Sequence, residues 1–500
     1  MSKKVLCLLL SCLLVLVALV ACQEPNEGEK QTGSSLPATS PDTDAPDEGR
    51  SGTKDNLPET MDFGGSDVVF HVRGDDDAVI EIFVEEDNTQ NRVNQAVYNR
   101  NEAVNNRLKV NVKVHVANGW ATYGDSMNEL IGSINAGDAS FDIISAWSHM
   151  CTSPIAYGCY MDLSNVDYLD LAQPWWNQQI NETCNINDRQ YLAAGEISTS
   201  YTNCSYVYVF NKTVLEDFKN VITDNFYDVV LKDNWTIEYV DNIITNMNQD
   251  LNGDGVDEAD RFGLVTETVQ AADAYLQAFG VDLLGRDDTG YYFDTNMEKL
   301  VGTVERVYAL LYETEGAYVN NAANSSFSPI RAFEDDRSLF YVTYLWDVEH
   351  NMADMNSLYG ILPFPKYDAE QKDYYTPMSN GLSVMSIPID VKNVNMSAAV
   401  LEAMAAESYR KVTEEYYEVV LKGRYTQDEE SKEMLDIINR NRRVTFEVLY
   451  NNYLWTPLFV MRSMINNQTK DVVSWWDENY PLFESKLNDL MDELHSITVN

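Results

Sequence analysis

The chain alternates between two patterns of hydrophobic positions. Short runs rich in Val, Ile and Phe predict strands over 78–84, 109–116 and 141–144. Apolar residues at helical spacing predict helices over 88–107 and 126–136. The order strand, helix, strand, helix, strand is typical of an α/β layer structure, so we expect a sheet covered by helices.

A second set of strand and helix patterns follows after residue 205. Apolar runs predict strands over 206–210, 339–346 and 360–365, the last of which ends at prolines. Helical patterns fill most of 397–500. The chain therefore builds a second α/β layer after the first, and its folded part is long enough for two lobes.

An apolar run begins just after Lys3 and Lys4 and ends at Leu19-Val20-Ala21-Cys22. Its charged start, short apolar middle and small-residue exit indicate a secretory signal peptide over 1–21. The final cysteine resembles the lipobox of bacterial lipoproteins, in which that residue takes a diacylglyceryl group and becomes the mature N-terminus. We therefore expect Cys22 to anchor the protein in the outer face of the cell membrane. An ordinary signal peptide with a chance cysteine is the alternative.

The residues after Cys22 predict how the folded part is attached and divided. Residues 22–67 are mainly Gly, Pro, Ser, Thr, Asp and Glu, a composition that predicts a flexible tether. For the chain beyond it, the family resemblance described below implies the first part of lobe 1 over 68–205, the first part of lobe 2 over 206–380, a return to lobe 1 over 381–445, and C-terminal helices over 446–500.

The charge of the chain restricts its ligands. Its 79 acidic and 35 basic residues give a formal net charge of −44. Such an excess repels nucleic acid and polyanions and favours neutral or cationic ligands. The alternative is that the acidity only keeps an exported protein soluble.

The cysteines and histidines carry no zinc motif. Cys151, Cys159, Cys184 and Cys204 could form two disulfides or stay free, and their spacing leaves the choice open. The five histidines are scattered along the chain, without a His-Glu-x-x-His sequence.

Several short strings, in order, point to a known family. They are Phe141-Asp142-Ile143-Ile144-Ser145-Ala146-Trp147, Gly158 to Leu163, Tyr208 to Leu215, Asn234-Trp235-Thr236 followed by Asp250 to Gly255 and Phe262-Gly263-Leu264, Leu362 to Tyr367, and Ser386-Ile387-Pro388. Together the sequence resembles the extracellular solute-binding proteins of bacterial ABC importers, in the family (family 1) that includes maltose- and oligosaccharide-binding proteins. The order of the strings covers about 78–425, whereas Phe210 stands where the family usually has Tyr and the chain beyond 450 has no match.

This resemblance implies a fold, a function and partners. The fold would be the α/β, two-lobed type II fold of periplasmic binding proteins, with discontinuous lobes joined by a hinge. The protein would be a receptor and not an enzyme. It would capture a small solute, with an oligosaccharide as the expected ligand, and pass it to the membrane subunits of an ABC permease. A surface glycan-binding or sensor protein without an importer, or a glycoside hydrolase, would be the alternatives.

Aromatic residues at the ends of predicted strands are the candidate ligand contacts. Trp147 and Trp346 end predicted buried strands, and the flat face of a sugar ring packs well on an indole; the resemblance also implies an aromatic contact at Trp346. Tyr201, Trp175 and Trp176 are further candidates, with core packing as the alternative for every Trp. The polar candidates are His149, Ser198 and Asn380.

The turn from Asp250 to Arg261 is a candidate calcium loop. Asp250, Asn252 and Asp254 place oxygen donors at alternate positions, and a glycine, Gly255, stands at the sixth. The twelfth position has Arg261 where a calcium loop has a bidentate Glu. A hydrated Asx turn without metal is the alternative, and no other cofactor is expected.

Overall fold

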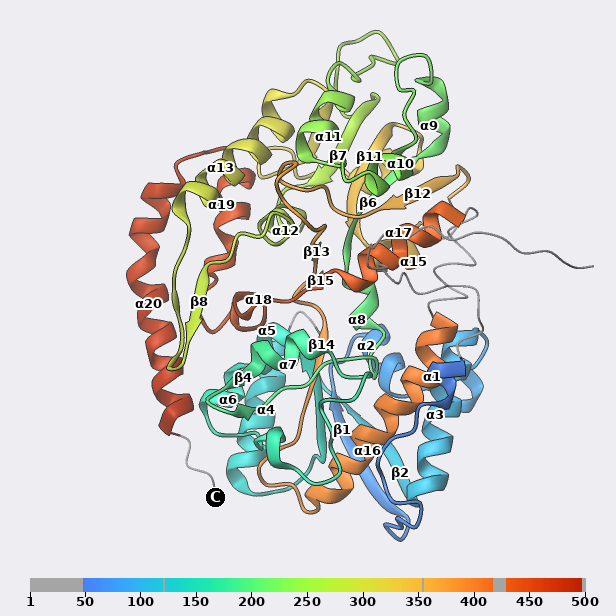
Figure 1. Cartoon of the computed structure of the whole chain (residues 1–500), viewed down its shortest axis with the longest axis vertical. Helices are drawn as coiled ribbons and strands as arrows, with labels where there is room; N and C mark the ends of the chain where they lie inside the picture. Colours follow the sequence, from blue (N-terminus) through green and yellow to red (C-terminus); the bar gives the residue numbers. More distant parts are fainter. Residues whose placement is uncertain (1–47, 120–121, 353–354, 417–428, 497–500) are drawn as a thin grey trace, which may run out of the picture. The chain divides into compact units, whose positions relative to one another are not determined.

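The computed structural model describes residues 48–119, 122–352, 355–416 and 429–496 (Figure 1). The chain from Glu48 onward forms one compact unit. In the described part of the chain, no helix combines the length and the apolar character that a membrane span needs.

The first sheet has four strands in the order β14-β3-β1-β2. They are β1 (Ser66–Val72), β2 (Val110–Val116), β3 (Ile143–Trp147) and β14 (Ser383–Ser386). The first three are parallel, and β14 runs antiparallel to β3. Helices α3 (Arg92–Leu108), α4 (Tyr123–Ala136) and α16 (Val394–Glu407) lie beside this sheet (Figure 1). The predicted helices over 88–107 and 126–136 and the strands over 109–116 and 141–144 are confirmed within a few residues.

The strand predicted over 78–84 is wrong, because this segment forms helix α2 (Asp76–Ile82). Buried Ala78 and Ile82 are four residues apart on one helix face, and Asp76 and Asp77 stabilise the positive end of the helix dipole. A short apolar run does not distinguish a strand from a buried helix by periodicity alone. The true first strand is β1, which begins where the predicted tether ends.

The predicted tether over 22–67 extends too far. Residues 48–67 include the short helix α1 (Glu48–Gly52) and the buried Leu57. Arg107 of α3 donates to both carboxylate oxygens of Asp55 at 2.7 Å. Residues 48–67 are therefore packed against the helices of the first sheet. The described residues do not include the earlier part of the tether, Cys22 or the signal peptide.

The second sheet has five strands in the order β10-β7-β11-β6-β12. They are β6 (Tyr206–Asn211), β7 (Phe262–Glu267), β10 (Ala317–Asn320), β11 (Ser338–Tyr344) and β12 (Tyr359–Leu362). β10 and β11 run parallel to β7, and β6 is antiparallel to both β11 and β12. The strand predicted over 339–346 ends earlier than expected, because helix α15 (Leu345–His350) begins directly after Tyr344.

Helices surround the second sheet and connect the strands. They are α9 (Lys212–Asp217), α10 (Phe226–Leu231), α11 (Ile237–Ile244), α12 (Gln270–Ala278), α13 (Met297–Tyr308) and α14 (Pro329–Glu334). Two-stranded pairs are formed by β4 (Asn185–Ile186) with β5 (Arg189–Gln190), β8 (Leu284–Asp287) with β9 (Gly290–Phe293), and β13 (Thr376–Pro377) with β15 (Arg442–Arg443). The short helices near the first sheet are α5 (Ser148–Cys151), α6 (Ser153–Ala156), α7 (Gln178–Cys184) and α8 (Ser200–Asn203).

We call the part built on the first sheet lobe 1 and the part built on the second sheet lobe 2. β14 and α16 return to lobe 1, as predicted for 381–445. Helix α17 (Glu429–Arg440), in the same range, instead buries Leu435 and Ile438 in the core of the second sheet, because its apolar stripe fits beside β12. This part of the predicted return is therefore wrong.

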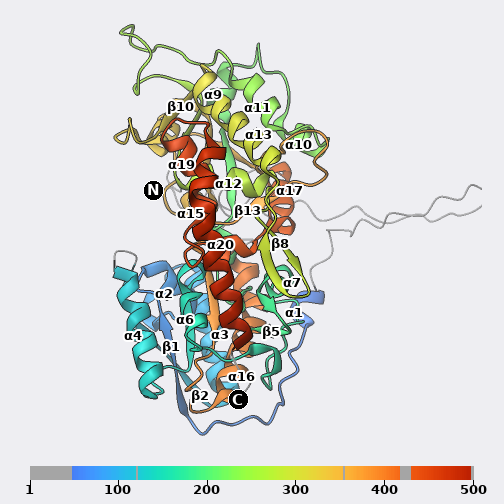
Figure 2. The same ribbon diagram turned by 90° about the vertical axis from the view of Figure 1, so that its left-hand side faces the viewer.

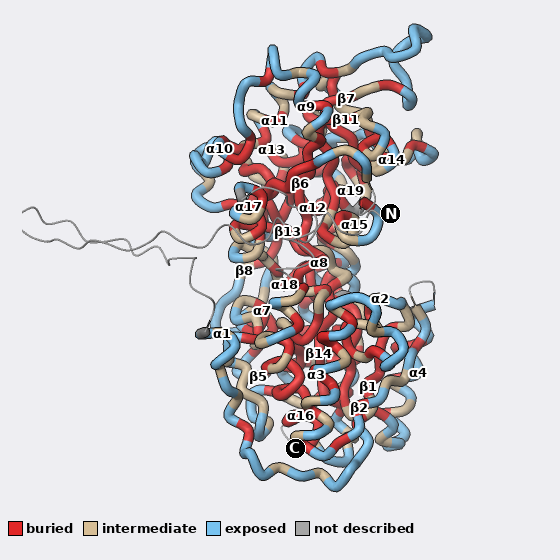
Figure 3. The backbone as a smooth tube through the Cα atoms, turned by 90° about the vertical axis from the view of Figure 1, so that its right-hand side faces the viewer, coloured by how far each residue is buried: buried red, intermediate tan, exposed pale blue. Residues whose placement is uncertain are grey.

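The C-terminal segment contacts both lobes. It contains α18 (Phe446–Tyr450), α19 (Val460–Asn466) and α20 (Val472–Ser496). Helix α20 packs against α13 and β9 of lobe 2 and against α6 of lobe 1, and Figure 2 shows it running past both. The central strands β3, β6 and β11 are almost fully buried, whereas the edge strand β2 is half exposed (Figure 3). The four cysteines within the described residues are free and buried, so no disulfide joins them.

Candidate functional site

Strand ends from both lobes meet at a cavity of about 300 Å³. Trp147 ends β3, Arg73 follows β1, and Trp346 stands on α15 just after β11. Asn380 comes from the segment that leads into β14. The structure thus brings Trp147, Trp346 and Asn380, three of the predicted contacts, to one cavity at the place where α/β sheets bind ligands.

Trp147 forms the lobe 1 side of this cavity together with a charged pair. The Arg73 guanidinium lies 4.1 Å from the centroid of the indole, and its Nε lies 2.8 Å from Asp75 Oδ2. Trp147 is only 6 % exposed. Its ring therefore holds Arg73 by a cation–π contact, and the polar edge of the cavity is made by Arg73 and Asp75.

Trp346 forms the lobe 2 side and also reaches lobe 1. Its Nε1 donates to Asp77 Oδ2 of α2 at 2.9 Å. The indole stacks on His350 with ring centroids 4.5 Å apart and on Tyr344 at 6.1 Å. These three rings form an aromatic row along the cavity wall, with Asp77 as the hydrogen-bonding group that orients the central ring.

A second cavity, of about 620 Å³, continues from the first. The two share Asp77, Asn203 and Trp346. The second also contains Glu349, whose pKa is raised by burial and which accepts a hydrogen bond from the Tyr416 hydroxyl. Two adjoining cavities lined by rings, carboxylates and amides suit an elongated ligand with many hydroxyl groups.

Several lining residues were missed by the sequence analysis. Arg73, Asp75 and Asp77 lie just after β1, and Asn203 belongs to α8. The signal was the run Asp75-Asp76-Asp77, which only Arg73 and Gly74 separate from the apolar segment that ends at Val72. Because the strand was placed at 78–84 instead of 66–72, these acids were not recognised as lying at the carboxyl end of a strand.

Other predicted contacts lie elsewhere. Trp175 and Trp176 are fully buried in the core of lobe 1, where Trp176 Nε1 donates to Glu402 at 3.0 Å, so their predicted role as ligand contacts is wrong. Tyr201 accepts a hydrogen bond from Asn177 and packs under Arg442, at 4.7 Å. Ser198 is buried and bonded to Glu81. His149 belongs to α5, but its side chain lies outside the described residues.

The acidic turn has the geometry of an Asx turn. Asp250 accepts hydrogen bonds from the backbone N–H groups of Asn252, Gly253 and Gly255, and these bonds lower its pKa. The Asn252 side chain accepts from the Asp254 N–H. A calcium ion at Asp250, Asn252 and Asp254 stays a prediction.

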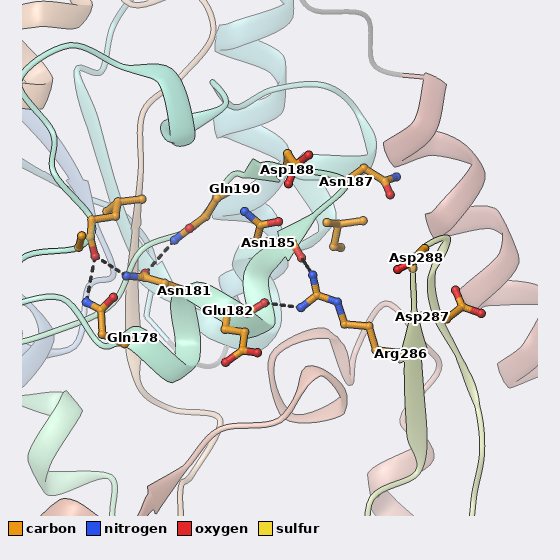
Figure 4. Close-up of a pocket in the computed structure, with 14 residues that line it drawn as sticks. Gln178, Asn181, Glu182, Asn185, Asn187, Asp188, Gln190, Arg286, Asp287 and Asp288 are labelled. Carbon is orange, nitrogen blue, oxygen red and sulfur yellow. Dashed lines mark hydrogen bonds between the residues drawn. The ribbon is translucent and has the colours of Figure 1, made fainter.

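A larger cavity, of about 1040 Å³, lies between α7, the β4–β5 turn and β8 (Figure 4). Arg286 donates to the carbonyls of Glu182 and Asn185 at 2.7 and 2.8 Å, and Gln190 donates to Asn181 at 2.8 Å. No aromatic side chain is among the described residues that line it. Because it lacks a stacking surface and lies away from the strand ends of the sheets, we assign the candidate ligand site to the two smaller cavities.

Comparisons with known proteins agree on the fold. No protein-family model matches the sequence, and a search of the curated proteins found no match. Among solved structures, the galacto-N-biose/lacto-N-biose I-binding protein of an ABC transporter from Bifidobacterium longum is 10% identical, with a TM-score of 0.53 over 87% of this chain and 99% of that one. An ABC substrate-binding protein from Listeria monocytogenes in complex with cycloalternan is 12% identical, with a TM-score of 0.51 over 86% and 98%.

A sugar transporter protein from Rhizobium etli gives a similar result, with 14% identity and a TM-score of 0.52 over 86% of this chain and 100% of that one. At such identities these likenesses show the fold alone. The chain has the α/β, two-lobed fold of periplasmic binding proteins, and the predicted fold class is confirmed.

Proposed function

We propose that this protein is the substrate-binding component of an ABC importer and captures a small neutral oligosaccharide between its lobes. The observation that carries the proposal is the meeting of Trp147 from lobe 1 and Trp346 from lobe 2 at one cavity, beside polar groups that can bond sugar hydroxyls. The solved structures of the same fold include proteins named for binding lacto-N-biose and cycloalternan.

The charge of the site favours a neutral solute. Asp75, Asp76, Asp77 and Glu349 line the two cavities, against Arg73 and Arg92. An anionic ligand would meet this excess of carboxylates at close range, which disfavours it. Asp75 is paired with Arg73, and Asp77 accepts from the Trp346 indole, so both carboxylates hold the site in shape. We therefore propose binding and not catalysis.

We further propose that the protein works outside the cell, held on the membrane through a diacylglyceryl group on Cys22. A permease would take the solute from it, with energy from a separate ATPase. The supporting features are the signal-like run that ends at Cys22 and the polar composition that follows it.

A thermal-shift and calorimetry panel tests the proposed ligand class. Neutral oligosaccharides of two to six sugar units are compared with amino acids and peptides. A ligand at about 100 times its Kd should raise the free energy of unfolding by about 2.7 kcal/mol. A shift with a peptide and none with any sugar would overturn the carbohydrate assignment.

A matched pair of variants places the binding site. Trp147→Ala should lose most of the sugar affinity, since it also releases Arg73. Trp455→Ala removes an indole that is 58 % exposed and lies outside both cavities, so it should bind like the wild type. Equal loss in both variants would contradict binding at the strand ends.

A further inference from the structure

The fold brings together two histidines that are 44 positions apart in the sequence. His71 of β1 and His115 of β2 are direct partners in the parallel register, so both side chains project from the same face of the sheet. Their rings stack with centroids 5.6 Å apart. Glu129 of α4 reaches the same place, with its Oε1 3.2 Å from His115 Nε2. We propose that His71, His115 and Glu129 form a binding site for a zinc ion.

The state of His71 is an independent observation that points to a ligand. His71 is completely buried, and neither of its ring nitrogens has a hydrogen-bond partner among the described residues. The rings of Phe141 and His71 pack in a T-shaped arrangement, with centroids 4.9 Å apart. A buried imidazole normally has a partner for its polar atoms. A metal ion would supply that partner to one of the two nitrogens.

The arrangement of donor atoms fits zinc. One nitrogen from each histidine and one oxygen of Glu129 all lie within 4.8 Å of one another. Two ligands of a tetrahedral zinc ion, each about 2.0–2.1 Å from the metal, lie about 3.3 Å apart, close to the 3.2 Å between His115 and Glu129. Because these two side chains are 40 % and 48 % exposed, they can turn toward His71 as the ion binds.

The donor types and the exposure define what kind of metal site this is. Imidazole nitrogen and carboxylate oxygen are ordinary zinc ligands, whereas calcium and magnesium prefer oxygen alone. Three protein ligands leave a fourth position, which opens to solvent on the side of His115 and Glu129. The ion would bind both strands to α4, within two residues of Arg73 at the strand ends.

Zinc titration of the mature protein tests the site. The protein is freed of metal with a chelator and titrated with Zn²⁺ by calorimetry, in millimolar Mg²⁺ that occupies the many surface carboxylates. We expect one tight site per chain and a rise in melting temperature on binding. His115→Ala and Glu129→Gln change exposed side chains and should fold, and each should weaken zinc binding at least tenfold.

Two control variants match these substitutions. Asp125→Asn changes another exposed acid of α4, and His495→Ala removes an exposed histidine of α20. Both should bind zinc like the wild type. The proposal is overturned if the wild type has no tight site, or if His115→Ala binds zinc as tightly as the wild type. The result is independent of the sugar panel, because no ligand of the strand-end cavities takes part.

Discussion

At the scale of single residues, Trp346 connects the two lobes through one side chain. Its ring belongs to the lobe 2 aromatic row, and its N–H binds Asp77 of lobe 1. Trp346→Ala removes both contributions, whereas Trp346→Phe keeps a ring and loses the hydrogen bond. We expect alanine to weaken oligosaccharide binding at least tenfold, equivalent to about 1.4 kcal/mol, and phenylalanine to weaken it less. Calorimetry with the best sugar of the panel measures both, and an alanine variant with wild-type affinity would show that Trp346 does not contact the ligand.

Glu402 gives a prediction about pH. It lies in the core of lobe 1 and accepts hydrogen bonds from Trp176 Nε1 and the Asp170 N–H, but burial outweighs these bonds and raises its pKa from 4.5 to about 7. The folded state therefore keeps the Glu402 proton up to a higher pH than the unfolded state does. The resulting stability is fully present below about pH 4.5 and is lost as the pH rises through about 7, a change of about 3 kcal/mol at most.

The variant Glu402→Gln should lose this dependence. The free energy of unfolding, measured by urea denaturation from pH 4.5 to 8.5, should fall more steeply with pH in the wild type than in the variant. Glu433→Gln, at an exposed position of α17, should follow the wild type. Parallel curves for the wild type and Glu402→Gln would mean that burial does not raise the pKa of Glu402 above its value in the unfolded chain.

At the scale of elements, one buried arginine fastens three separate segments of lobe 1. Arg100 of α3 donates to the carbonyls of Glu81 and Ile82 at the end of α2, at 3.1 and 2.7 Å. It also donates to the carbonyl of Ile197 and to Ser408 Oγ, each at 3.1 Å. The last two partners belong to the chain just before it leaves for lobe 2 and just after α16 has returned. Arg100 thus closes the discontinuous lobe where its pieces meet.

Arg100→Met should therefore destabilise the protein by about 3–5 kcal/mol, because it leaves several buried carbonyls without donors. Arg92→Met is the matched control on the same helix. Arg92 pairs with Glu415 at 2.8 Å but is 66 % exposed, so its loss should cost less than about 1 kcal/mol. Chemical denaturation compares the two, and equal effects would show that the Arg100 contacts add little to stability.

The elements were predicted well where the pattern fits one kind of element and poorly where it fits two. The 17-residue α3 and the strand β6 have unambiguous patterns, and both were found within a few residues. The run Ala78 to Val84 satisfies both a strand and a helix, and only the packing of Ala78 and Ile82 decides for the helix. The site followed the same rule. Trp147 and Trp346 could be predicted to line the cavity because the apolar runs before them indicate where strands end. The positions of Asp77 and Asn203 beside the cavity depend on how the chain folds in three dimensions, which the local sequence pattern does not show.

At the scale of the whole molecule, the described chain links its lobes in more ways than the crossing segments alone. Helix α20 packs on α13 and α6, α18 packs on α5, and Arg189 of lobe 1 donates to the Leu494 carbonyl of α20. The Trp346–Asp77 bond joins the lobes at the cavity. We expect an opening between the lobes to break the bond at the cavity and to keep the packing of α20, so that the lobes turn about the side of the molecule where α20 lies.

Distance measurements between two introduced labels test this motion. Val221 of lobe 2 and Ile389 of lobe 1 are 81 % and 48 % exposed and suit replacement by cysteine, with Cys22 changed to serine. The native thiols should stay unlabelled, because burial raises the pKa of Cys151, Cys184 and Cys204 to about 12 and that of Cys159 to about 11. Oligosaccharide should shorten the distance between the two dyes, and Trp346→Ala should shift the ligand-free protein toward longer distances, since it lacks the bond to Asp77. If a sugar that raises the melting temperature leaves the distance unchanged in both proteins, the lobes do not close around the ligand and the cavity at the strand ends binds it as a rigid site.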